Sequence, residues 1–463
     1  MYQEYIKLSE IVNYQKGFAF KSKDYQNNGI GIIRVSDFDG NSININNLYF
    51  VSEKIANENK KYELKENDIL ITTVGATAGN FVLVPKEADG LLLNQNIVRI
   101  RLKSDNKLEQ IYLFYALKNN NFTQFLLSGA SGSAQASITL DQILKTKINY
   151  LPQKNRESIA TILSNFDQKI TLNTQTNQTL EQIAQATFKH WFIDFAPAHA
   201  KANALARGET IEQAELAAMA CLSGKTAEKI TALKTQDPTT YHQLQQTAAA
   251  FPSEFVETEM GLVPKGWERT TLNHICEMKN GYAFKSKEWT DEGMPVIKIG
   301  SVKPMLIELD NGSFVAAENE TLRADFLASE GDILVGLTGA YVGKVGRIPY
   351  QGKAMINQRV AKFVPKKITE IINHYCFIYC LTRQKIFKEF IETNAKGSAQ
   401  ANISTREILS YPVIIATKEI HIAFENTVKK LLDKIIVNSG ENSTLAKTRD
   451  ELLPRLLSGE VEL

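Results

Sequence analysis

A stretch of about forty residues without proline or glycine, residues 156–195, constrains the fold most strongly. Its apolar and small residues recur at alternating steps of three and four, the spacing of one stripe along an α-helix. At ~1.5 Å per residue such a helix is on the order of 60 Å long, so it needs a second long helix to bury its stripe. The stripe consists of Ile159, Ile162, Phe166, Ile170, Asn173, Asn177, Leu180, Ala184, Thr187 and Trp191.

The C-terminal region supplies a second stripe of the same kind. A shift of 265 residues superimposes the two, and Asn173 and Asn177 then fall on Asn438 and Asn442. Two long helices paired as an antiparallel coiled coil are therefore predicted, with the asparagines fixing their register at some cost in stability. One difference is that Gly440 stands in the second predicted helix where the first has Gln175, which weakens the prediction of a continuous second helix there. Its members are Ile420, Phe424, Thr427, Leu431, Ile435, Asn438, Asn442, Leu445, Arg449, Leu452 and Leu456.

The rest of the chain is also duplicated, with a shift of 264 residues that drifts by only one or two. The order of the repeated segments never changes, so one unit of globule plus long helix is used twice. The paired segments are 17–23 with 281–287, 68–70 with 332–334, 75–76 with 339–340, Gly79 with Gly343, 94–95 with 357–358, and 132–136 with 397–401.

Short apolar runs, glycine- and asparagine-rich turns and helical periods alternate within each globule. The predicted fold class is therefore α+β, with two similar mixed α/β domains joined by two long antiparallel coiled-coil helices in a pseudo-two-fold internal repeat. The expected divisions are a first globular domain at 1–152, a central helix at 153–195, a connector with short helices at 196–264, a second globular domain at 265–412 and a C-terminal helix at 413–463.

Composition excludes several classes of protein. The 463 residues, 43% of them hydrophobic, suffice for two or more cores. No apolar run approaches the ~20 residues of a membrane span, and the first residues do not resemble a signal peptide. Of the four cysteines, Cys376 and Cys380 lie four residues apart on an apolar stretch and fit buried thiols of a cytosolic protein better than a metal site. With a net charge of +2, any basic surface must be local.

Two equal units in one chain tend to relate by a pseudo-two-fold axis, as subunits of a dimer do. If the long helices pair antiparallel, their length fixes the distance between the globules. Double-stranded DNA repeats every ~34–36 Å, so a rod of 50–60 Å would hold two readers about one and a half turns apart. The pattern alone supports equally a duplicated scaffold that binds two protein partners without reading DNA.

No catalytic constellation is visible. The glycine-rich segment 339–345 resembles a phosphate-binding loop, but it is one residue short and ends in valine where a Ser or Thr must bind magnesium. A strand–turn–strand with glycines at positive φ is the better interpretation. The six histidines show no paired spacing, and the carboxylates show no nuclease arrangement. We therefore expect no catalytic residue and no metal site in this chain.

Candidate contacts to nucleic acid are basic side chains in or near the repeated segments and one glutamine in each matching loop. Lys and Arg supply affinity through phosphates, whereas Arg, Asn or Gln at base edges supply specificity. Positions that repeat suit phosphate contacts or folding, because two different half-sites need different base readers. Each residue taken alone also fits a solvated charge or a turn. The candidates are Lys21, Lys23, Arg34, Arg99, Arg101 and Gln135 in the first copy, and Lys285, Lys287, Lys298, Lys303, Lys344, Arg347, Arg359 and Gln400 in the second.

The ordered set of repeats and the two helices resemble the specificity subunit of a type I restriction-modification system over essentially the whole chain. The resemblance is carried by a set of short segments rather than by one decisive motif. These are the segments 281–286, 331–334 followed by Gly339 and Gly343, 357–358, 453–460 and 261–267, the last reading GLVPKGW.

The resemblance implies that each globule is a target-recognition domain that reads half of a bipartite DNA sequence. It implies that the helices are spacer regions that dock two modification subunits, which methylate adenine with S-adenosylmethionine. Restriction subunits with ATP-driven translocation would join the same cytoplasmic complex. By this resemblance the chain itself is a non-catalytic DNA-binding subunit without a cofactor, and S-adenosylmethionine, ATP and Mg belong to its partners.

Overall fold

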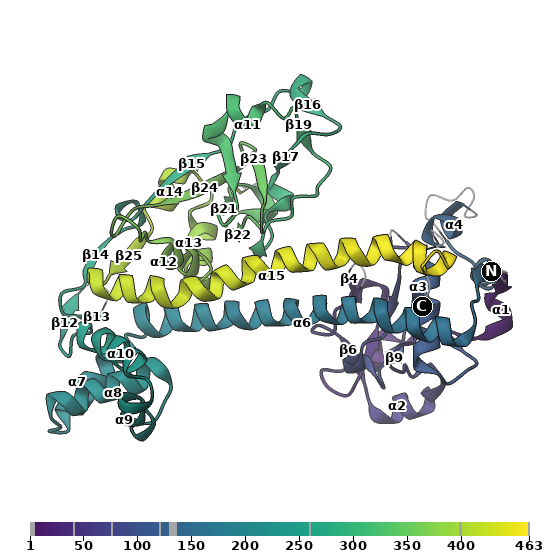
Figure 1. Cartoon of the computed structure of the whole chain (residues 1–463), viewed down its shortest axis with the longest axis horizontal. Helices are drawn as coiled ribbons and strands as arrows, with labels where there is room; N and C mark the ends of the chain where they lie inside the picture. The colour runs from purple at the N-terminus through teal and green to yellow at the C-terminus, as the bar shows by residue number, and fades with distance from the viewer. Residues whose placement is uncertain are drawn as a thin grey trace. The chain divides into compact units, whose positions relative to one another are not determined.

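The computed structural model describes residues 5–39, 42–75, 77–119, 122–128, 137–258, 261–397 and 401–461. The chain forms two units, Met1–Thr171 with Ser443–Leu463, and Leu172–Asn442. Each unit contains one set of sheets and a part of both long helices, α6 (Gln153–Phe192) and α15 (Lys418–Ser458) (Figure 1). No helix among the described residues is long and apolar enough to cross a membrane.

The first unit is built on two small sheets. A four-stranded antiparallel sheet has the order β2-β10-β7-β8, and a three-stranded mixed sheet has the order β6-β3-β9. The pairs β1–β11 and β4–β5 complete it. The strands are β1 (Tyr5–Lys7), β2 (Val12–Lys16), β3 (Ile30–Ile33), β4 (Phe38–Asp39), β5 (Ser42–Ile43), β6 (Tyr49–Val51), β7 (Ile69–Thr72), β8 (Phe81–Leu83), β9 (Leu92–Leu93), β10 (Ile97–Leu102) and β11 (Lys147–Asn149).

The second unit has two five-stranded sheets, in the orders β15-β24-β21-β22-β18 and β16-β19-β17-β23-β20, besides the pairs β12–β13 and β14–β25. The strands are β12 (Phe255–Thr258), β13 (Gly261–Pro264), β14 (Glu268–Thr271), β15 (Cys276–Asn280), β16 (Trp289–Thr290), β17 (Met294–Ile297), β18 (Met305–Leu306), β19 (Phe314–Val315), β20 (Leu327–Ser329), β21 (Ile333–Gly336), β22 (Val345–Arg347), β23 (Lys353–Ile356), β24 (Val360–Pro365) and β25 (Pro412–Ile415).

The two units share one framework. The order β2-β10-β7-β8 matches β15-β24-β21-β22, and β6-β3-β9 matches β19-β17-β23. Both central strands β10 and β24 alternate buried and partly exposed side chains, as half-buried strands do. This confirms the predicted α+β class with a duplicated mixed α/β domain. The extra strands of the second unit extend the sheets at their edges.

Helices cover the sheets and join them to the long helices. In the first unit, α3 (Lys107–Asn119) is followed by α4 (Phe122–Ser128); in the second, α12 (Tyr375–Thr382) is followed by α13 (Lys385–Asn394). Ile69 and Ile100 of the first sheet pack with Tyr112 of α3 and with Ile159 of α6 in one buried cluster. Sheet, short helix and long helix therefore share one hydrophobic core in each unit.

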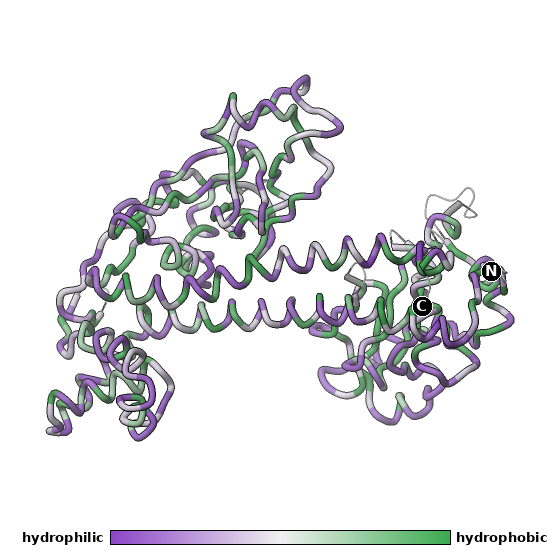
Figure 2. Tube along the Cα trace, viewed as in Figure 1, coloured by the Kyte–Doolittle hydropathy of each residue, from purple (hydrophilic) through white to green (hydrophobic). Residues whose placement is uncertain are grey.

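The long helices contact each other through different chemistry in each unit (Figure 2 shows their alternating hydropathy). In the second unit, Asn438 donates to Asn177 at 2.8 Å and Asn173 donates to Asn442 at 2.9 Å. In the first unit, Arg449 pairs with Asp167. Residue numbers of the contacting partners rise along α6 while they fall along α15, so the two helices run antiparallel, as predicted.

Two details of the predicted stripe differ from the structure. Thr427 is exposed, and Val428 occupies the buried position beside Phe424. The first helix ends at Phe192 rather than near residue 195, where Phe195 adopts a left-handed conformation with φ of 48°. The expected interruption of the second helix at Gly440 is not found, because α15 continues through this residue to Ser458.

Four helices follow α6 in the sequence and precede the second set of sheets, in the stretch without a counterpart at the N-terminus; Figure 1 shows them beside the end of α6. Their small core contains Met219, Ile230 and Ala248. Lys201, which is 7% exposed, donates to the carbonyls of Ala248 and Phe251 and so satisfies the C-terminal end of the last helix. The helices are α7 (Ala196–Ala206), α8 (Ile211–Ser223), α9 (Ala227–Gln236) and α10 (Pro238–Ala250).

Candidate nucleic-acid interface

A two-residue turn connects the two sheets of the first unit. Gln95 and Asn96 form this turn between β9 and β10, and both are exposed although the strands on either side are buried. The Gln95 amide donates to Phe18 O at 2.9 Å, and Asn96 O accepts from Thr73 N at 2.9 Å. The backbone of the turn is therefore held on both sides while its two side chains face outward.

The second unit repeats this arrangement with different residues. Gln358 and Arg359 form the turn between β23 and β24, and both are exposed. The Gln358 amide donates to Tyr282 O at 3.0 Å, and Arg359 O accepts from Leu337 N at 3.0 Å. The four side chains of the two turns make no hydrogen bond or ion pair with any other described residue.

Close backbone approach explains why a glycine and the Asn-Gln pair repeat together. A Cβ at Gly17 would lie 1.7 Å from Asn94 O, and one at Gly281 would lie 2.2 Å from Asn357 O. Phe18 pairs with Asn94, and Tyr282 with Asn357, in isolated parallel bridges. These repeated residues therefore hold the turn in place, which is a structural role.

The glycine-rich segments lie next to the turns. In the second unit, Gly339 and Gly343 have φ of 61° and 73° and bracket the turn between the antiparallel strands β21 and β22. Gly339 N donates to Ala401 O at 2.7 Å, so the end of the last repeated segment, 397–401, meets this turn. The strand–turn–strand interpretation is confirmed, and the segment opens no long helix of the kind that holds a nucleotide.

The repeated lysines lie on the surface. Lys21 and Lys23, like Lys285 and Lys287, are exposed beside a short 3-10 turn in each unit. The phenylalanine before each pair is buried, at 7% exposure for Phe20 and 8% for Phe284. This segment leads directly away from the turn to which Phe18 or Tyr282 is bonded, so the lysines and the turn belong to one region of each unit.

Most other basic candidates are held by a neighbour but keep an accessible side. Arg34 binds Asp37 at 2.8 Å and lies over the Tyr49 ring at 3.9 Å. In the second unit, Lys298 lies 4.3 Å from the Trp289 ring centre and Lys344 lies 4.2 Å from that of Tyr341. Lys303 is exposed and 3.7 Å from Glu308, and such surface pairs contribute little stability.

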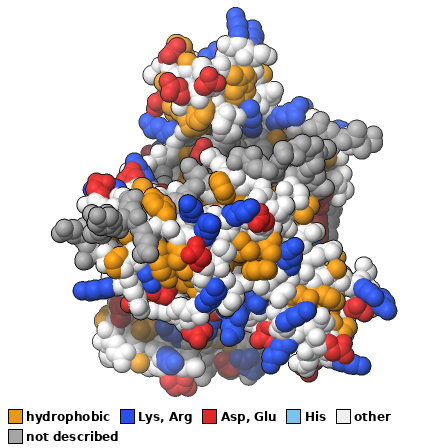
Figure 3. Space-filling model, turned by 90° about the vertical axis from the view of Figure 1, so that its right-hand side faces the viewer, with side chains coloured by type: hydrophobic (Ala, Val, Ile, Leu, Met, Phe, Trp, Pro, Cys, Tyr) orange, Lys and Arg blue, Asp and Glu red, His pale blue; other side chains and the backbone are white. Residues whose placement is uncertain are grey.

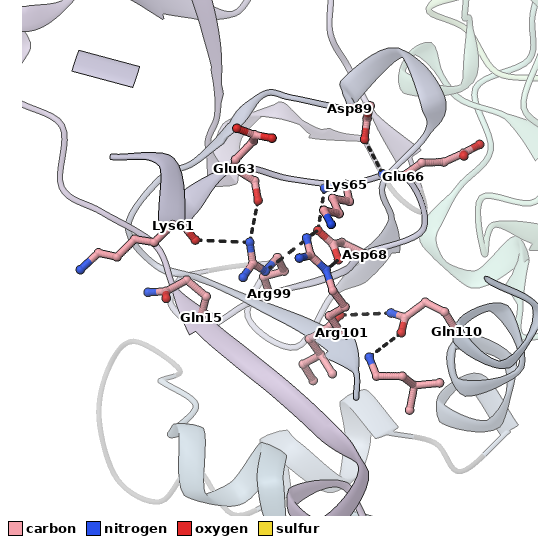
Figure 4. Close-up of polar contacts among 12 residues, drawn as sticks. Gln15, Lys61, Glu63, Lys65, Glu66, Asp68, Asp89, Arg99, Arg101 and Gln110 are labelled. Atoms are coloured by element: carbon pink, nitrogen blue, oxygen red, sulfur yellow. Dashed lines mark hydrogen bonds and ion pairs between the residues drawn. The ribbon is translucent and has the colours of Figure 1, made fainter. Parts of the chain in front are cut away.

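Arg99 and Arg101 belong to an internal network (Figure 4). Nε and Nη2 of Arg101 each donate to the buried Asp68 carboxylate at 2.6 Å, and Arg99 donates to Glu63 O at 2.6 Å. Burial and the charge of Arg101 lower the pKa of Arg99. In the second unit, Asp332 has a corresponding partner in Lys362 at 3.1 Å. The repeated aspartate therefore anchors a cross-strand cation.

The prediction that Arg347 contacts nucleic acid is wrong. Its side chain is 0% exposed, donates to Leu432 O of α15 at 3.1 Å and lies over the Tyr379 ring at 4.6 Å. A guanidinium without accessible surface cannot contact DNA, so Arg347 joins β22 to α15 and α12 instead. Gln135 and Gln400, the two predicted loop glutamines, lie outside the described residues.

Sequence reasoning missed Gln95, Asn96 and Gln358 as surface side chains of the turn. A signal was present, because the Asn-Gln pair repeats and is followed in each copy by a polar residue that differs. The face drawn in Figure 3 carries Lys and Arg interspersed with acidic and hydrophobic side chains, with no single type dominating. This face therefore shows no predominantly basic surface.

The described residues contain no group of three His, Cys, Asp or Glu side chains placed to hold a metal. Cys376 and Cys380 are buried free thiols, and burial raises the pKa of both. A buried thiol with a raised pKa is a poor nucleophile. The arrangement in both units is that of a rigid turn with presented side chains, which suits recognition.

Comparison with known proteins agrees with this arrangement. The family model described as type I restriction modification DNA specificity domain matches residues 3–182 and 264–444, one match in each copy of the repeat. The stretch with helices α7–α10 lies between the two matched ranges.

Among curated proteins, the HindI type I restriction enzyme specificity subunit of Haemophilus influenzae is 32% identical, covering 87% of this chain and 88% of that protein. The MjaIX specificity subunit of Methanocaldococcus jannaschii is 26% identical over 76% of this chain and 69% of that protein. In fold, the chain is similar to the type I restriction-modification S subunit of M. genitalium, with a TM-score of 0.50, 18% identity and coverage of 98% and 96%. This chain belongs to the family of type I restriction-modification DNA specificity subunits.

Proposed function

We propose that each globular part of this subunit reads one half of a bipartite double-stranded DNA target. The observation that carries the proposal is one framework built twice with different presented residues. The framework holds Gln95 and Asn96 in one unit and Gln358 and Arg359 in the other on backbones fixed by the same hydrogen bonds. Two readers that share a scaffold but differ at the exposed turn suit two different half-sites.

The long helices α6 and α15 would set the length of the unread spacer. Asn177 with Asn438 and Asn173 with Asn442 support this role, because buried polar pairs penalise a slip of one helix along the other. A fixed register makes helix length a fixed distance. The same helices would dock two modification subunits, and restriction subunits would join the assembly.

In this proposal the chain supplies no cofactor and no catalytic group. S-adenosylmethionine would be held by the modification subunits, which methylate adenine, and ATP and Mg by the partner subunits. The lysine pairs of the two units, Lys21 with Lys23 and Lys285 with Lys287, would contact phosphates, because they are alike in both readers. Since these partners act on chromosomal DNA, the complex would work in the cytoplasm.

The test is to co-express the chain with its neighbouring methyltransferase and map methylated adenines across a genome. We expect one bipartite motif with an unread spacer of constant length. A contiguous motif, or none, would contradict the proposal. A gel shift of the full complex should weaken steeply with salt. Binding that ignores salt and sequence would instead support a scaffold for two protein partners.

The proposal that the long helices set the spacer length has its own test. Inserting four residues, about one helical turn, into both long helices near Asn173 and Asn438 adds about 6 Å. We expect the spacer to grow by about two base pairs with both half-sites unchanged. An insertion in only one helix, which breaks the asparagine register, is the control and should abolish methylation. An unchanged spacer in the double insertion would refute the proposal that helix length sets the spacer.

A further inference from the structure

The turn of the second unit and the turn of the first unit differ at one position. Arg359 stands in the second unit where the first has Asn96, whereas the preceding glutamine is the same in both. Phosphate contacts can be alike in two readers, but base contacts to different sequences must differ. The differing residue of an otherwise shared turn is therefore placed as a base reader should be.

The backbone at Arg359 is fixed before any ligand binds. Its carbonyl accepts from Leu337 N at 3.0 Å, and Val360 N donates back to Asn357 O at 2.9 Å. The guanidinium, in contrast, is exposed and has no hydrogen bond, ion pair or ring contact with another described residue. The other arginine candidate of this unit, Arg347, is buried. A free arginine fork on a rigid turn costs little ordering when it binds.

The hydrogen-bonding groups of the arginine side chain determine which base it can bind. Arginine binds the O6 and N7 acceptors of guanine with two parallel hydrogen bonds in the major groove, and asparagine binds the N6 and N7 of adenine in the same way. We infer that Arg359 selects a guanine in the half-site read by the second unit and that Asn96 selects an adenine in the half-site read by the first. The inference rests on the proposed function, because it presupposes that the units read DNA.

Asn96 has a second reason to be asparagine, since its φ of 66° is a conformation that asparagine tolerates. Arg359 is not among the residues with positive φ, so backbone conformation does not explain it. Arg359 therefore carries the stronger half of the inference, and the variant at Asn96 must keep the left-handed turn. Aspartate does so while losing the amide donor that adenine N7 requires.

The experiment compares methylation motifs of complexes containing the wild-type chain, Arg359→Gln, Asn96→Asp or the control Arg406→Gln. Arg406 is exposed on the helix Thr405–Leu409 of the second unit and is not part of the turn. We expect Arg359→Gln to lower the preference for guanine at one position by about 10- to 100-fold, with adenine gaining. Asn96→Asp should relax one adenine in the other half-site. Arg406→Gln should leave the motif unchanged.

Two results would overturn the inference while leaving the proposed function intact. The first is an unchanged motif in Arg359→Gln. The second is an equal loss at all sites with a salt slope reduced by about one, which would make Arg359 a phosphate contact. A wild-type complex without any bipartite motif would reject the proposed function itself. Fluorescence of Trp191, Trp267 and Trp289, all in the second unit, checks that Arg359→Gln is folded.

Discussion

In each unit a short helix that covers the sheets contacts a long helix, α3 contacting α6 and α12 contacting α15, but the buried polar groups at the two contacts differ. In the first unit, Arg156 at the start of α6 forms an ion pair with Glu109 of α3, and their side chains are only 9% and 6% exposed. In the second unit, His421 near the start of α15 lies against His374 with ring centres 4.8 Å apart. One junction is a buried ion pair and the other is a pair of buried imidazoles.

The histidine junction has a third member. Glu425 of α15 is 3% exposed and accepts from the backbone N–H groups of Cys376 and Phe377, at 2.8 and 2.9 Å, at the start of α12. Neither ring nitrogen of His421 has a hydrogen-bond partner in the described part of the chain. A shared fold therefore does not require shared charges, and the two junctions should respond differently to mutation and to pH.

The largest effect is expected at the ion pair of the first unit. Arg156→Met should destabilise the protein by about 3–5 kcal/mol, because it leaves the Glu109 carboxylate buried without a partner. The measurement is urea unfolding followed by far-UV circular dichroism, which reports on both units. The double variant Arg156→Met with Glu109→Met is the control and should recover most of the loss. A cost below about 1 kcal/mol would show that water reaches the pair.

The next effect compares one tyrosine hydroxyl in each unit. Tyr379 donates to Glu181 at 2.8 Å, and Tyr115 donates to Asp167. Each carboxylate also pairs with an arginine, Glu181 with Arg383 and Asp167 with Arg449, but the Glu181 side chain is 10% exposed and that of Asp167 is 33% exposed. Tyr379→Phe should therefore cost about 1.5–2 kcal/mol and Tyr115→Phe about 1 kcal/mol or less. Thermal unfolding measures both losses. Equal losses would contradict the expectation that the more buried hydrogen bond contributes more stability.

The long helices and the duplicated framework could be predicted because period and repeat are local properties of the sequence. The contacts of individual side chains could not be predicted, because they depend on residues far away in the sequence. Arg347 in an apolar strand looks like a surface charge until the carbonyl of Leu432, 85 residues away, is brought against it. His374 and His421 likewise meet only through the packing of α12 on α15. At the candidate site, Arg359 was predicted and its fixed turn was not, because that turn depends on bonds to distant strands.

The histidine junction should make the second unit sensitive to acid. Burial lowers the pKa of His421 to about 3, and burial with the charge of His274 lowers that of His374 to about 4. Both imidazoles take up protons more readily when unfolded, so stability is full above pH ~6.5 and falls below it. Each contributes a loss of about 1.4 kcal/mol per pH unit until its folded pKa is reached.

Glu425 opposes this trend. Burial raises its pKa to about 7, although the two N–H groups and Lys429 favour the ionised form, so its contribution is lost as pH rises from ~4.5 to ~7. The net loss from pH 6.5 to 5.5 should be about 1 kcal/mol, because pH 6.5 is the midpoint of the unfolded histidine titration. Tryptophan fluorescence during urea unfolding reports it, because all three tryptophans lie in the second unit. Glu425→Gln should about double the slope; an unchanged slope would exclude Glu425 from the titration.

The smallest expected effect concerns the glycine that distinguishes the two helices. A Cβ at Gly440 would lie 2.3 Å from the ring of Tyr350, whose backbone N–H donates to Ser439 Oγ at 3.2 Å. Gly440 therefore allows a strand-connecting loop of the second unit to rest on α15, and the helix accepts its poor propensity there.

Gly440→Ala should destabilise by about 1 kcal/mol, because overpacking of about 1–3 kcal/mol outweighs a gain in helix propensity of about 1 kcal/mol. Thermal unfolding measures the difference. In a Tyr350→Ala background the clash is absent, so the same substitution should stabilise the protein by up to about 1 kcal/mol. This reversal of sign is the decisive result: a substitution that destabilises both backgrounds would mean that the glycine serves something other than Tyr350.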